Sequence, residues 1–488
     1  MPPKPPGFFK LAGPGVVMVG LAIGAGELII WPITTARFGA VVTWAAVLGI
    51  TLQLLINIEV GRYTLATGES AYTAFCRLSP TWAGVFLALN VAGWLLPGWA
   101  RTCAGAVKAL AVGPGGPGEP WAWTALTFAC VGLVLLGPRN IYGWIEKIVV
   151  TLTVVMLAGL VTIVLAVGNL AASKDLLAGV LDFGFKPSGM PAYELFSAVV
   201  FAGAGGTANL LFSYYLRDKG WGMAGRLDDR MESEDAWQPQ ADESNRLRWR
   251  AWFTHMVKDQ TLFFWFTNLV TLLMFVFGAL VVLRPAGIVP AREMLILEEA
   301  TILGSTWGKQ GELLFMLTGI ACLFSTQLTL LDGVSRSCAE LIRRNFAWAS
   351  SYTLRSCYRT IALAWMVSGT CLTWAWGNLP PFVFLLSAGF FGGIAMAIYC
   401  PLLFVINTRL LPAHCRPSPL QRAGIVIVSL FYIAFALVSV TVVGGRLLGS
   451  RPPHLRPSGS VAALAPCFVR PHGVLPNGQV KCAPSLSC

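Results

Sequence analysis

The sequence predicts an all-α polytopic membrane protein. Apolar residues make up 56% of its 488 residues and charged residues only 12%, which is about half the charged share of a soluble globular protein. The apolar residues lie in long uninterrupted runs, which indicate helices, whereas the strands of a membrane barrel would alternate. This composition argues against a water-soluble enzyme, a disordered chain and a disulfide scaffold.

A helix needs about 20 apolar residues to cross the hydrocarbon core of a bilayer. By this criterion the chain contains about eleven transmembrane helices, and glycine interrupts the first and the sixth of them. Their approximate ranges are 13–36, 41–66, 82–111, 121–137, 143–168, 191–215, 260–284, 311–334, 358–376, 381–408 and 422–446.

The distribution of positive charge predicts the orientation and the partners. The net charge is +12, from 35 basic and 23 acidic residues, and the Lys and Arg residues are concentrated in alternate loops. This bias predicts a plasma (inner) membrane protein with a cytoplasmic N-terminus. No basic stripe alternates with aromatic residues, so nucleic acid is not an expected partner. The lipid bilayer and a transported inorganic cation are expected partners, and a homo-oligomer stays open.

The predicted helices fall into two blocks of five, followed by an eleventh helix. One loop is strongly charged, with eight basic and eight acidic residues between Arg217 and Lys258, and it reads as a solvated cytoplasmic loop. The predicted parts are a cytoplasmic N-terminus (1–12), a first five-helix repeat (13–168), an outer loop (169–190), a second repeat (191–410) that includes the charged loop 217–258, the eleventh helix (411–447) and a disordered tail (448–488).

A short glycine motif occurs once in each block. The first helix contains Gly24-Ala25-Gly26-Glu27, and the sixth contains Gly203-Ala204-Gly205-Gly206; the two Gly-Ala-Gly triplets are 179 residues apart. Each triplet lies in the first helix of its block. Because a block of five helices is odd in number, the second block crosses the membrane in the opposite sense. The spacing therefore predicts an inverted repeat.

The two glycine motifs also predict where a substrate binds. Glycine in a helix interior costs up to about 1 kcal/mol relative to alanine, so both helices are expected to unwind at these points. Unwound backbone at membrane depth is tolerated where it lines a cavity or binds a ligand. Close helix packing through small residues is the alternative explanation. The predicted binding residues are Gly24, Gly26, Glu27, Gly203, Gly206 and Asn209.

Glu27 is the predicted charged ligand of this site. It follows the first glycine motif directly, near the middle of its helix, where an acidic side chain costs roughly 2.5 kcal/mol or more to insert. A carboxylate at that cost indicates a cation ligand or a proton carrier. A structural ion pair with Arg37 or Arg101 is the alternative.

Other polar side chains within the predicted helices are weaker candidates for functional residues. Asp332 and Gln327 in the eighth helix, with Gln53 and Asn90, are candidates for ion coupling or for lining the pathway. Asp332 lies four residues before Arg336, so an ordinary helical ion pair explains it equally well. The amides also serve to hold helices together.

Three segments resemble the natural resistance-associated macrophage protein (Nramp) family of metal transporters. The segment GPGVVMVGLAIGAGELIIWPITTARFGA is similar to the first helix of that family, LQLLINIEVGRYTLATGES to its second, and GPRNIYGWIEKIVV to its fourth-to-fifth connection. The resemblance covers about residues 11–411. It implies a LeuT-type 5+5 inverted-repeat fold with broken helices 1 and 6, and transport by alternating access.

The motifs that define the metal site of that family are changed here. Its Asp-Pro-Gly-Asn motif falls on Gly24 to Glu27, and its Met-Pro-His motif falls on Gly206 to Ala208. The family's backbone carbonyl ligand corresponds to a position near Gly203. Loss of the soft methionine ligand leaves oxygen donors, which suit hard cations such as magnesium or manganese. No histidine lies in the middle of a predicted helix.

The leading hypothesis is thus a secondary active transporter for a divalent cation, with Glu27 as the metal ligand, no cofactor, and proton coupling left open. The closest alternative is the same fold carrying a small organic solute such as an amino acid, whose amine, or a sodium ion, Glu27 would bind. A non-transporting receptor or scaffold is an alternative of another class. An enzyme is not expected, because no HExxH or GxSxG motif is present.

Overall fold

The protein is described by a computed structural model. It describes residues 2, 3, 5, 13–137, 151, 154–155, 157–166, 170–227, 242–290 and 294–447. Residues 1–439 form one compact unit, and residues 440–488 form a second, of which 440–447 are described. The predicted tail 448–488 and most of the predicted N-terminal segment 1–12 lie outside the described residues.

The described residues form helices joined by turns and contain no strand. In chain order the elements are α1 (Pro14–Ala22), η2 (Ile23–Ile30), α2 (Trp31–Phe38), η3 (Ala40–Val42), α3 (Thr43–Thr67), α4 (Ala71–Leu78), α5 (Thr81–Trp94), α6 (Gly98–Val112), α7 (Pro120–Leu136), α9 (Leu170–Leu181), α10 (Ala192–Val200), α11 (Ala208–Asp218), η4 (Gly222–Arg226), α12 (Glu243–Asp259), η5 (Gln260–Thr267), α13 (Asn268–Gly278), η6 (Ala279–Leu283), α14 (Leu295–Asn345), η8 (Ala347–Ala349), α15 (Leu354–Ala375), α16 (Pro381–Arg409), η9 (Ala413–Cys415) and α17 (Pro419–Leu447).

Seven described helices are long and apolar enough to cross a membrane. The number is eight if the helix Leu157–Ala166 and α9, which meet at 119°, form one bent span. The two halves of the predicted sixth span and the helix α7 are shorter. The predicted all-α membrane class is therefore confirmed, and most predicted ranges agree with observed helices within a few residues. The predicted number of eleven spans stays a prediction, because most of 143–168 lies outside the described residues.

The first span does not unwind at its glycines, which corrects the prediction from the sequence. α1, η2 and α2 form one continuous helix, and η2 is a π-helix in which the Trp31 N–H bonds to the Gly26 carbonyl. A π-helical turn is wider than an α-helical turn and takes up one extra residue while keeping the backbone bonded. The glycines thus widen the helix instead of opening it.

The sixth span is broken, as predicted. α10 ends at Val200 and α11 begins at Ala208, and the segment between them is irregular. Gly205 and Gly206 have φ values of +72° and +54°, which other residues rarely adopt. The helix therefore breaks at the glycines that the sequence contains there.

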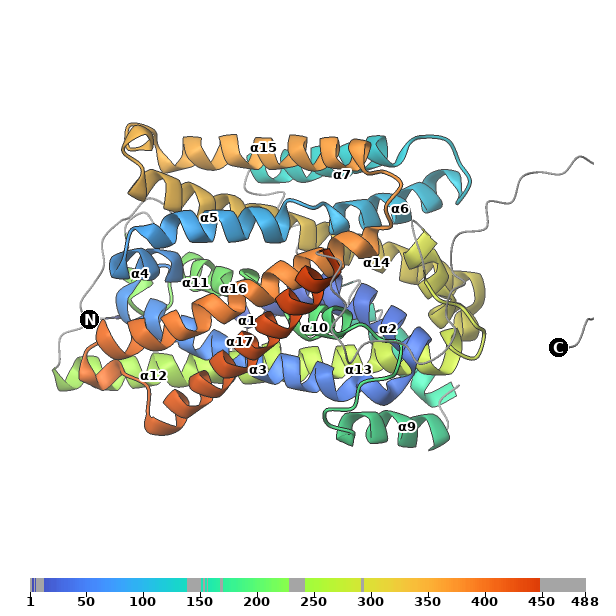
Figure 1. Cartoon of the computed structure of the whole chain (residues 1–488), viewed down its shortest axis with the longest axis horizontal. Coiled ribbons are helices and arrows are strands. Elements are labelled where there is room, and N and C mark those ends of the chain that lie inside the picture. The colour runs from blue at the N-terminus through green and yellow to red at the C-terminus, as the bar shows by residue number, and fades with distance from the viewer. Residues whose placement is uncertain are drawn as a thin grey trace, which may run out of the picture. The chain divides into compact units, whose positions relative to one another are not determined.

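The third span is broken as well, which the sequence analysis did not predict. α5 ends at Trp94 and α6 begins at Gly98. Pro97 has no N–H, so it cannot continue the helical hydrogen bonding. The Trp94 carbonyl, freed by the break, accepts a hydrogen bond of 3.2 Å from the Trp365 indole of α15. α15 runs beside α7 along this part of the protein (Figure 1).

The described residues of the predicted charged loop 217–258 are largely helical, where the sequence analysis assigned no helix. α11 reaches Asp218, residues 228–241 lie outside the described residues, and α12 begins at Glu243. Asp242 caps that helix by accepting a hydrogen bond of 2.7 Å from the Asn245 N–H. α12 then continues through η5 and α13 to η6, so the helix that contains the seventh span begins well before the predicted residue 260.

This long helix also fixes the start of the first span. The Asp259 carboxylate accepts hydrogen bonds from the N–H groups of Gly13 (3.0 Å) and Gly15 (2.8 Å). These are among the N–H groups that have no partner within α1 itself. A carboxylate 244 residues away thus caps the N-terminus of α1.

Gly26→Ala is expected to destabilise the fold. A Cβ at Gly26 would overlap the Phe201 carbonyl oxygen, which is backbone and cannot rotate away. The expected cost is about 1–3 kcal/mol, as for other overpacking substitutions. Thermal unfolding of the purified protein in detergent measures it. Gly20→Ala is the matched control, because no atom lies within 4 Å of a Cβ built there; equal melting temperatures for the two variants would contradict the prediction.

Candidate functional site

The π-helical turn of the first span lies against the break in the sixth span. Gly26 faces the Phe201 carbonyl, the first residue after α10, and Gly24 faces Thr326 on α14. Thr326 also donates a hydrogen bond of 3.3 Å to the Gly20 carbonyl. The absence of side chains at Gly24 and Gly26 allows both neighbours to approach the backbone. The structure therefore brings the two predicted glycine motifs together.

Gln53 holds the broken segment in place. Its amide nitrogen donates to the Val200 carbonyl (2.8 Å), and its amide oxygen accepts from the Gly205 N–H (2.9 Å). Gly203 lies against the same side chain. Gln53, predicted as a coupling or pathway residue, therefore supplies to the break the hydrogen bonds that an intact helix would provide.

Glu27 is fully buried next to this junction. Neither of its carboxylate oxygens makes a hydrogen bond of normal geometry to a described residue. The Thr271 hydroxyl on α13 is a neighbouring polar group, and it donates its own hydrogen bond of 3.1 Å to the Asn268 carbonyl. The alternative of a structural ion pair is wrong: Arg37 pairs with Glu194, and Arg101 donates to the carbonyls of Gly377 and Leu379. Among the described residues, Glu27 thus has no cationic side chain as a partner.

One face of α13 joins Glu27 to the break. Asn268 donates a hydrogen bond of 3.2 Å to the Ala202 carbonyl, while its own amide oxygen has no partner among the described residues. Thr271 lies one helical turn further along the same face. This side of the junction therefore carries several oxygen atoms that can coordinate a cation: the Glu27 carboxylate, the Asn268 amide oxygen and the carbonyls of the break.

Gly206 and Asn209 face α16 instead. The Tyr399 hydroxyl donates to the Gly206 carbonyl (3.0 Å) and accepts from the Asn209 amide (3.3 Å). Gly206 also lies directly against Gly392. Of the six predicted binding residues, these two therefore help to attach α11 to α16.

Asp332 and Asn90 have structural partners. Asp332 forms an ion pair of 2.9 Å with Arg336 and accepts from the Tyr358 hydroxyl at 2.8 Å, so the ordinary helical pair is confirmed. Asn90 donates to Ser337 at 3.1 Å and joins α5 to α14. Both residues lie outside the contacts that surround Glu27.

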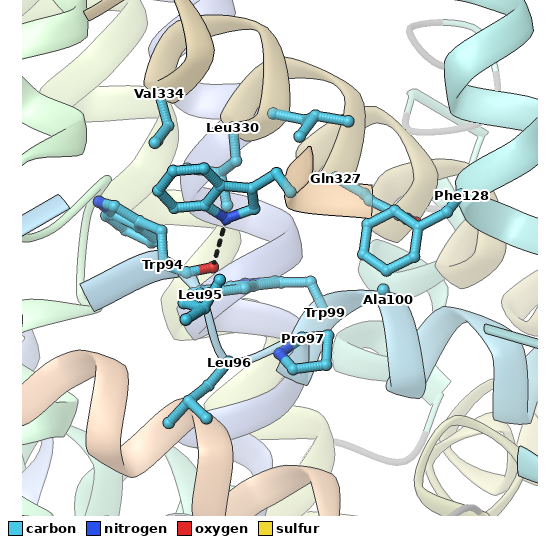
Figure 2. Close-up of a pocket in the computed structure, with 12 residues that line it drawn as sticks. Trp94, Leu95, Leu96, Pro97, Trp99, Ala100, Phe128, Gln327, Leu330 and Val334 are labelled. Atoms are coloured by element: carbon cyan, nitrogen blue, oxygen red, sulfur yellow. Dashed lines mark hydrogen bonds between the residues drawn. The ribbon is translucent and has the colours of Figure 1, made fainter. Parts of the chain in front are cut away.

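Gln327 reaches a different cavity, which lies at the break in the third span. Figure 2 shows this cavity of about 40 Å³, which aromatic rings surround on several sides. Neither amide atom of Gln327 has a hydrogen-bond partner among the described residues, and the same holds for the Trp99 indole N–H. The lining residues are Trp94, Leu95, Leu96, Pro97, Trp99, Ala100, Phe128, Gln327, Leu330, Leu331, Val334 and Trp365.

This aromatic cavity also touches the broken sixth span. The Trp94 indole donates a hydrogen bond of 2.6 Å to the Thr207 hydroxyl. The ring centroids of Trp99 and Phe201 are 5.7 Å apart in an edge-to-face contact, a favourable aromatic arrangement. The breaks in the third and sixth spans therefore support each other.

The sequence analysis missed Glu299. This residue lies in the first part of α14, before the kink at Gly308, and it is fully buried without a hydrogen bond to a described residue. Its segment had been assigned to a loop between two spans. The helical spacing of Leu295, Ile296, Ile302 and Leu303 was the signal that could have indicated a packed helix there.

The donors at Glu27 fit a hard cation better than a soft one. No group of three or more His, Cys, Asp or Glu side chains suited to a metal occurs among the described residues. A single carboxylate with neutral oxygen donors is available instead. Such a set suits a cation that accepts carbonyl, amide and water oxygens, and provides no thiolate, thioether or imidazole ligand.

Solved structures with the same architecture identify the fold. The sequence matches no protein-family model and no curated protein. A mutant of the Eremococcus coleocola manganese transporter, an Nramp-type protein, superposes with a TM-score of 0.64 at 15% identity over 92% of this chain and 90% of that one. The same transporter in complex with an aromatic bis-isothiourea compound gives 0.63 at 14% identity over 93% and 91%.

A second kind of transporter has a similar structure. MhsT in complex with L-phenylalanine gives a TM-score of 0.54 at 16% identity, over 90% of this chain and 98% of that one. Identities this low establish the fold alone. The chain is an integral membrane protein with the LeuT-type fold, as the resemblance implied. Within that fold its similarity extends to a manganese transporter and to an amino-acid-bound transporter.

Gln53→Leu is expected to loosen the broken segment. The substitution leaves the Gly205 N–H and the Val200 carbonyl without their partner, at about 1–3 kcal/mol for each buried group left unpaired. Hydrogen exchange of peptides that cover residues 200–208 should become faster, while peptides from α15 stay unchanged. Unaltered exchange at 200–208 would show that Gln53 does not stabilise the break.

Proposed function

We propose that this protein is a secondary active transporter that moves a divalent cation, manganese-like or magnesium-like, across the membrane by alternating access. The observation that carries the proposal is the fully buried Glu27 carboxylate, which has no cationic partner in the part of the chain that the structure describes and lies at the junction of the π-helical turn and the broken sixth span. Burial of such a group is unfavourable unless it binds a cation or a proton.

The arrangement suggests how a cation would be held. Glu27 would supply the negative charge, and the Thr271 hydroxyl, the Asn268 amide oxygen and the Phe201 carbonyl beside Gly26 would be candidate neutral ligands. Binding would favour the ionised form of Glu27 over the neutral form. The bound cation would also lie between the π-helical turn and the break in the sixth span. Its binding free energy could therefore favour one relative position of these two elements over another.

The irregular segment between α10 and α11 provides the flexible point. Because Gly205 and Gly206 have positive φ values, no continuous series of backbone hydrogen bonds joins the two half-helices. Gln53, Asn268 and Tyr399 attach this segment to three different helices. A change at any one attachment would therefore alter how the two halves are oriented, which is what alternating access requires.

Glu27→Gln is expected to abolish cation uptake. The amide keeps the shape of the side chain but removes the charge, so initial uptake of manganese or magnesium should fall by about 100-fold or more, beyond the loss typical of an outer-shell change. The measurement is uptake by proteoliposomes that contain the purified protein, with a cation gradient across the membrane.

Glu119→Gln is the matched control, because Glu119 is an exposed residue just before α7. It should transport as the unaltered protein does. Uptake by the unaltered protein that Glu27→Gln leaves intact would contradict the role of Glu27. Absence of uptake for every cation would contradict the proposed function as a whole.

A small organic solute is the second candidate substrate. The observation that favours it is the group of Trp94, Trp99 and Phe201 rings beside the break, next to the unpartnered amide of Gln327. Aromatic surfaces with few polar groups are typical of sites for organic ligands. Uptake of aromatic amino acids by the same proteoliposomes, without cation uptake, would favour this candidate over the first.

A further inference from the structure

Glu299 is a second buried carboxylate that the proposed cation site does not use. It is fully buried in α14, and neither oxygen has a hydrogen-bond partner among the described residues. The charged group that acts on it is the neighbouring Glu298, which has the same sign. No described cation compensates its charge.

The positions of neighbouring residues place Glu299 near the helices that surround Glu27. Leu28, the residue after Glu27, and Ile296, one turn before Glu299, both lie against Gly319. On α13, Thr271 interacts with Glu27, and Gly278, two turns later on the same face, lies against Ile302. Ile302 is one turn after Glu299. Thr271 and Gly278 are roughly 10 Å apart along α13 by helical rise, so Glu27 and Glu299 belong to segments that pack near the same face of α13.

The charged side chains described on the elements around Glu299 contact groups other than Glu299. Arg37 at the end of α2 pairs with Glu194. The Arg284 guanidinium, just after η6, lies against Gly39. Lys108 on α6 donates to the Gly118 carbonyl, and Glu312 on α14 lies beside Gly304. A carboxyl group in these surroundings is tolerated in the neutral, protonated form, because an isolated buried charge costs far more.

We propose that Glu299 is the proton-binding site of this transporter, separate from the cation ligand Glu27. In the state that admits water to this part of α14, the Glu299 carboxylate accepts one proton from water. In the closed state it is buried as the neutral acid, and it returns the proton to water when it is next exposed. No other bond changes. The proposal rests on the proposed transport function and adds the coupled ion and its site.

The kink at Gly308 gives this part of α14 a means to move. Gly308 has a φ of +58° inside a helix of 51 residues, a conformation that residues with side chains rarely adopt. The short arm that carries Glu299 is thereby separated from the longer arm that contacts the first span through Thr326. A change of angle at Gly308 would expose Glu299 to water without disrupting the longer arm.

Glu299→Gln separates proton movement from cation movement. In proteoliposomes that enclose a pH-sensitive dye, the unaltered protein should move protons together with manganese. The variant should lose about 100-fold of its proton flux, the scale on which one positioned acid–base group contributes, and its manganese uptake should no longer vary with pH. Glu119→Gln, at the exposed residue just before α7, is the control and should behave as the unaltered protein does.

Infrared spectroscopy provides a measurement that does not require transport. The C=O stretching band of a protonated carboxyl group should lose intensity in Glu299→Gln and keep it in Glu119→Gln. If Glu299→Gln does not fold, Glu299→Asp should retain a proton flux with a shifted pH profile. A carboxyl band of equal intensity in the unaltered protein, in Glu299→Gln and in the control variant would overturn the proposal.

The outcomes distinguish this inference from the proposed function. If the unaltered protein takes up no cation, the proposed function fails. If it takes up cation, and Glu299→Gln retains both the proton flux and the pH dependence, the proposed function stands and the role of Glu299 is overturned. A protonated Glu299 whose removal changes neither flux would be a structural acid, which also overturns the proposal.

Discussion

The structure depends on supplying hydrogen bonds to a helix that is interrupted inside an apolar interior. An unpaired backbone group costs several kcal/mol in hydrocarbon, so the seven residues between α10 and α11 need partners from other helices. Gln53 on α3, Asn268 on α13 and Tyr399 on α16 provide them. Each of these three side chains comes from a different part of the chain, so the break can form only when the whole bundle is assembled.

The same requirement explains why the breaks lie close together. The Gly98 N–H bonds to the Leu96 carbonyl at the break, which leaves the Trp94 carbonyl free to accept from Trp365. The Trp94 indole in turn donates to Thr207 in the sixth span. One residue thus connects an interruption in the third span to an interruption in the sixth. The π-helical turn of the first span lies against the same segment. Irregular backbone is concentrated in one region of the bundle, where each irregular segment provides partners for another.

The sequence was sufficient to predict the class of the protein, most helix ranges and the position of the sixth-span break. It was also sufficient to predict that Glu27 lies at that break, because a carboxylate is rare in an apolar run. It was not sufficient to predict how Gly24 and Gly26 would act. Glycine permits unwinding, π-helical widening and close packing alike, and only the approach of Phe201 and Thr326 determines which of these occurs. Glu299 escaped notice because its burial depends on packing against helices that are distant in the sequence.

The long helix from Glu243 to Leu283 has 41 residues, which corresponds to about 60 Å at 1.5 Å per residue. The hydrocarbon core is about 30 Å thick, so roughly half of this rod extends past the bilayer, and its charged beginning meets water. Asp259, near the middle of the rod, is bonded to the first amides of the span that carries Glu27. A shift of the first span would therefore also move this long helix, whose N-terminal end is accessible to soluble molecules on one side of the membrane.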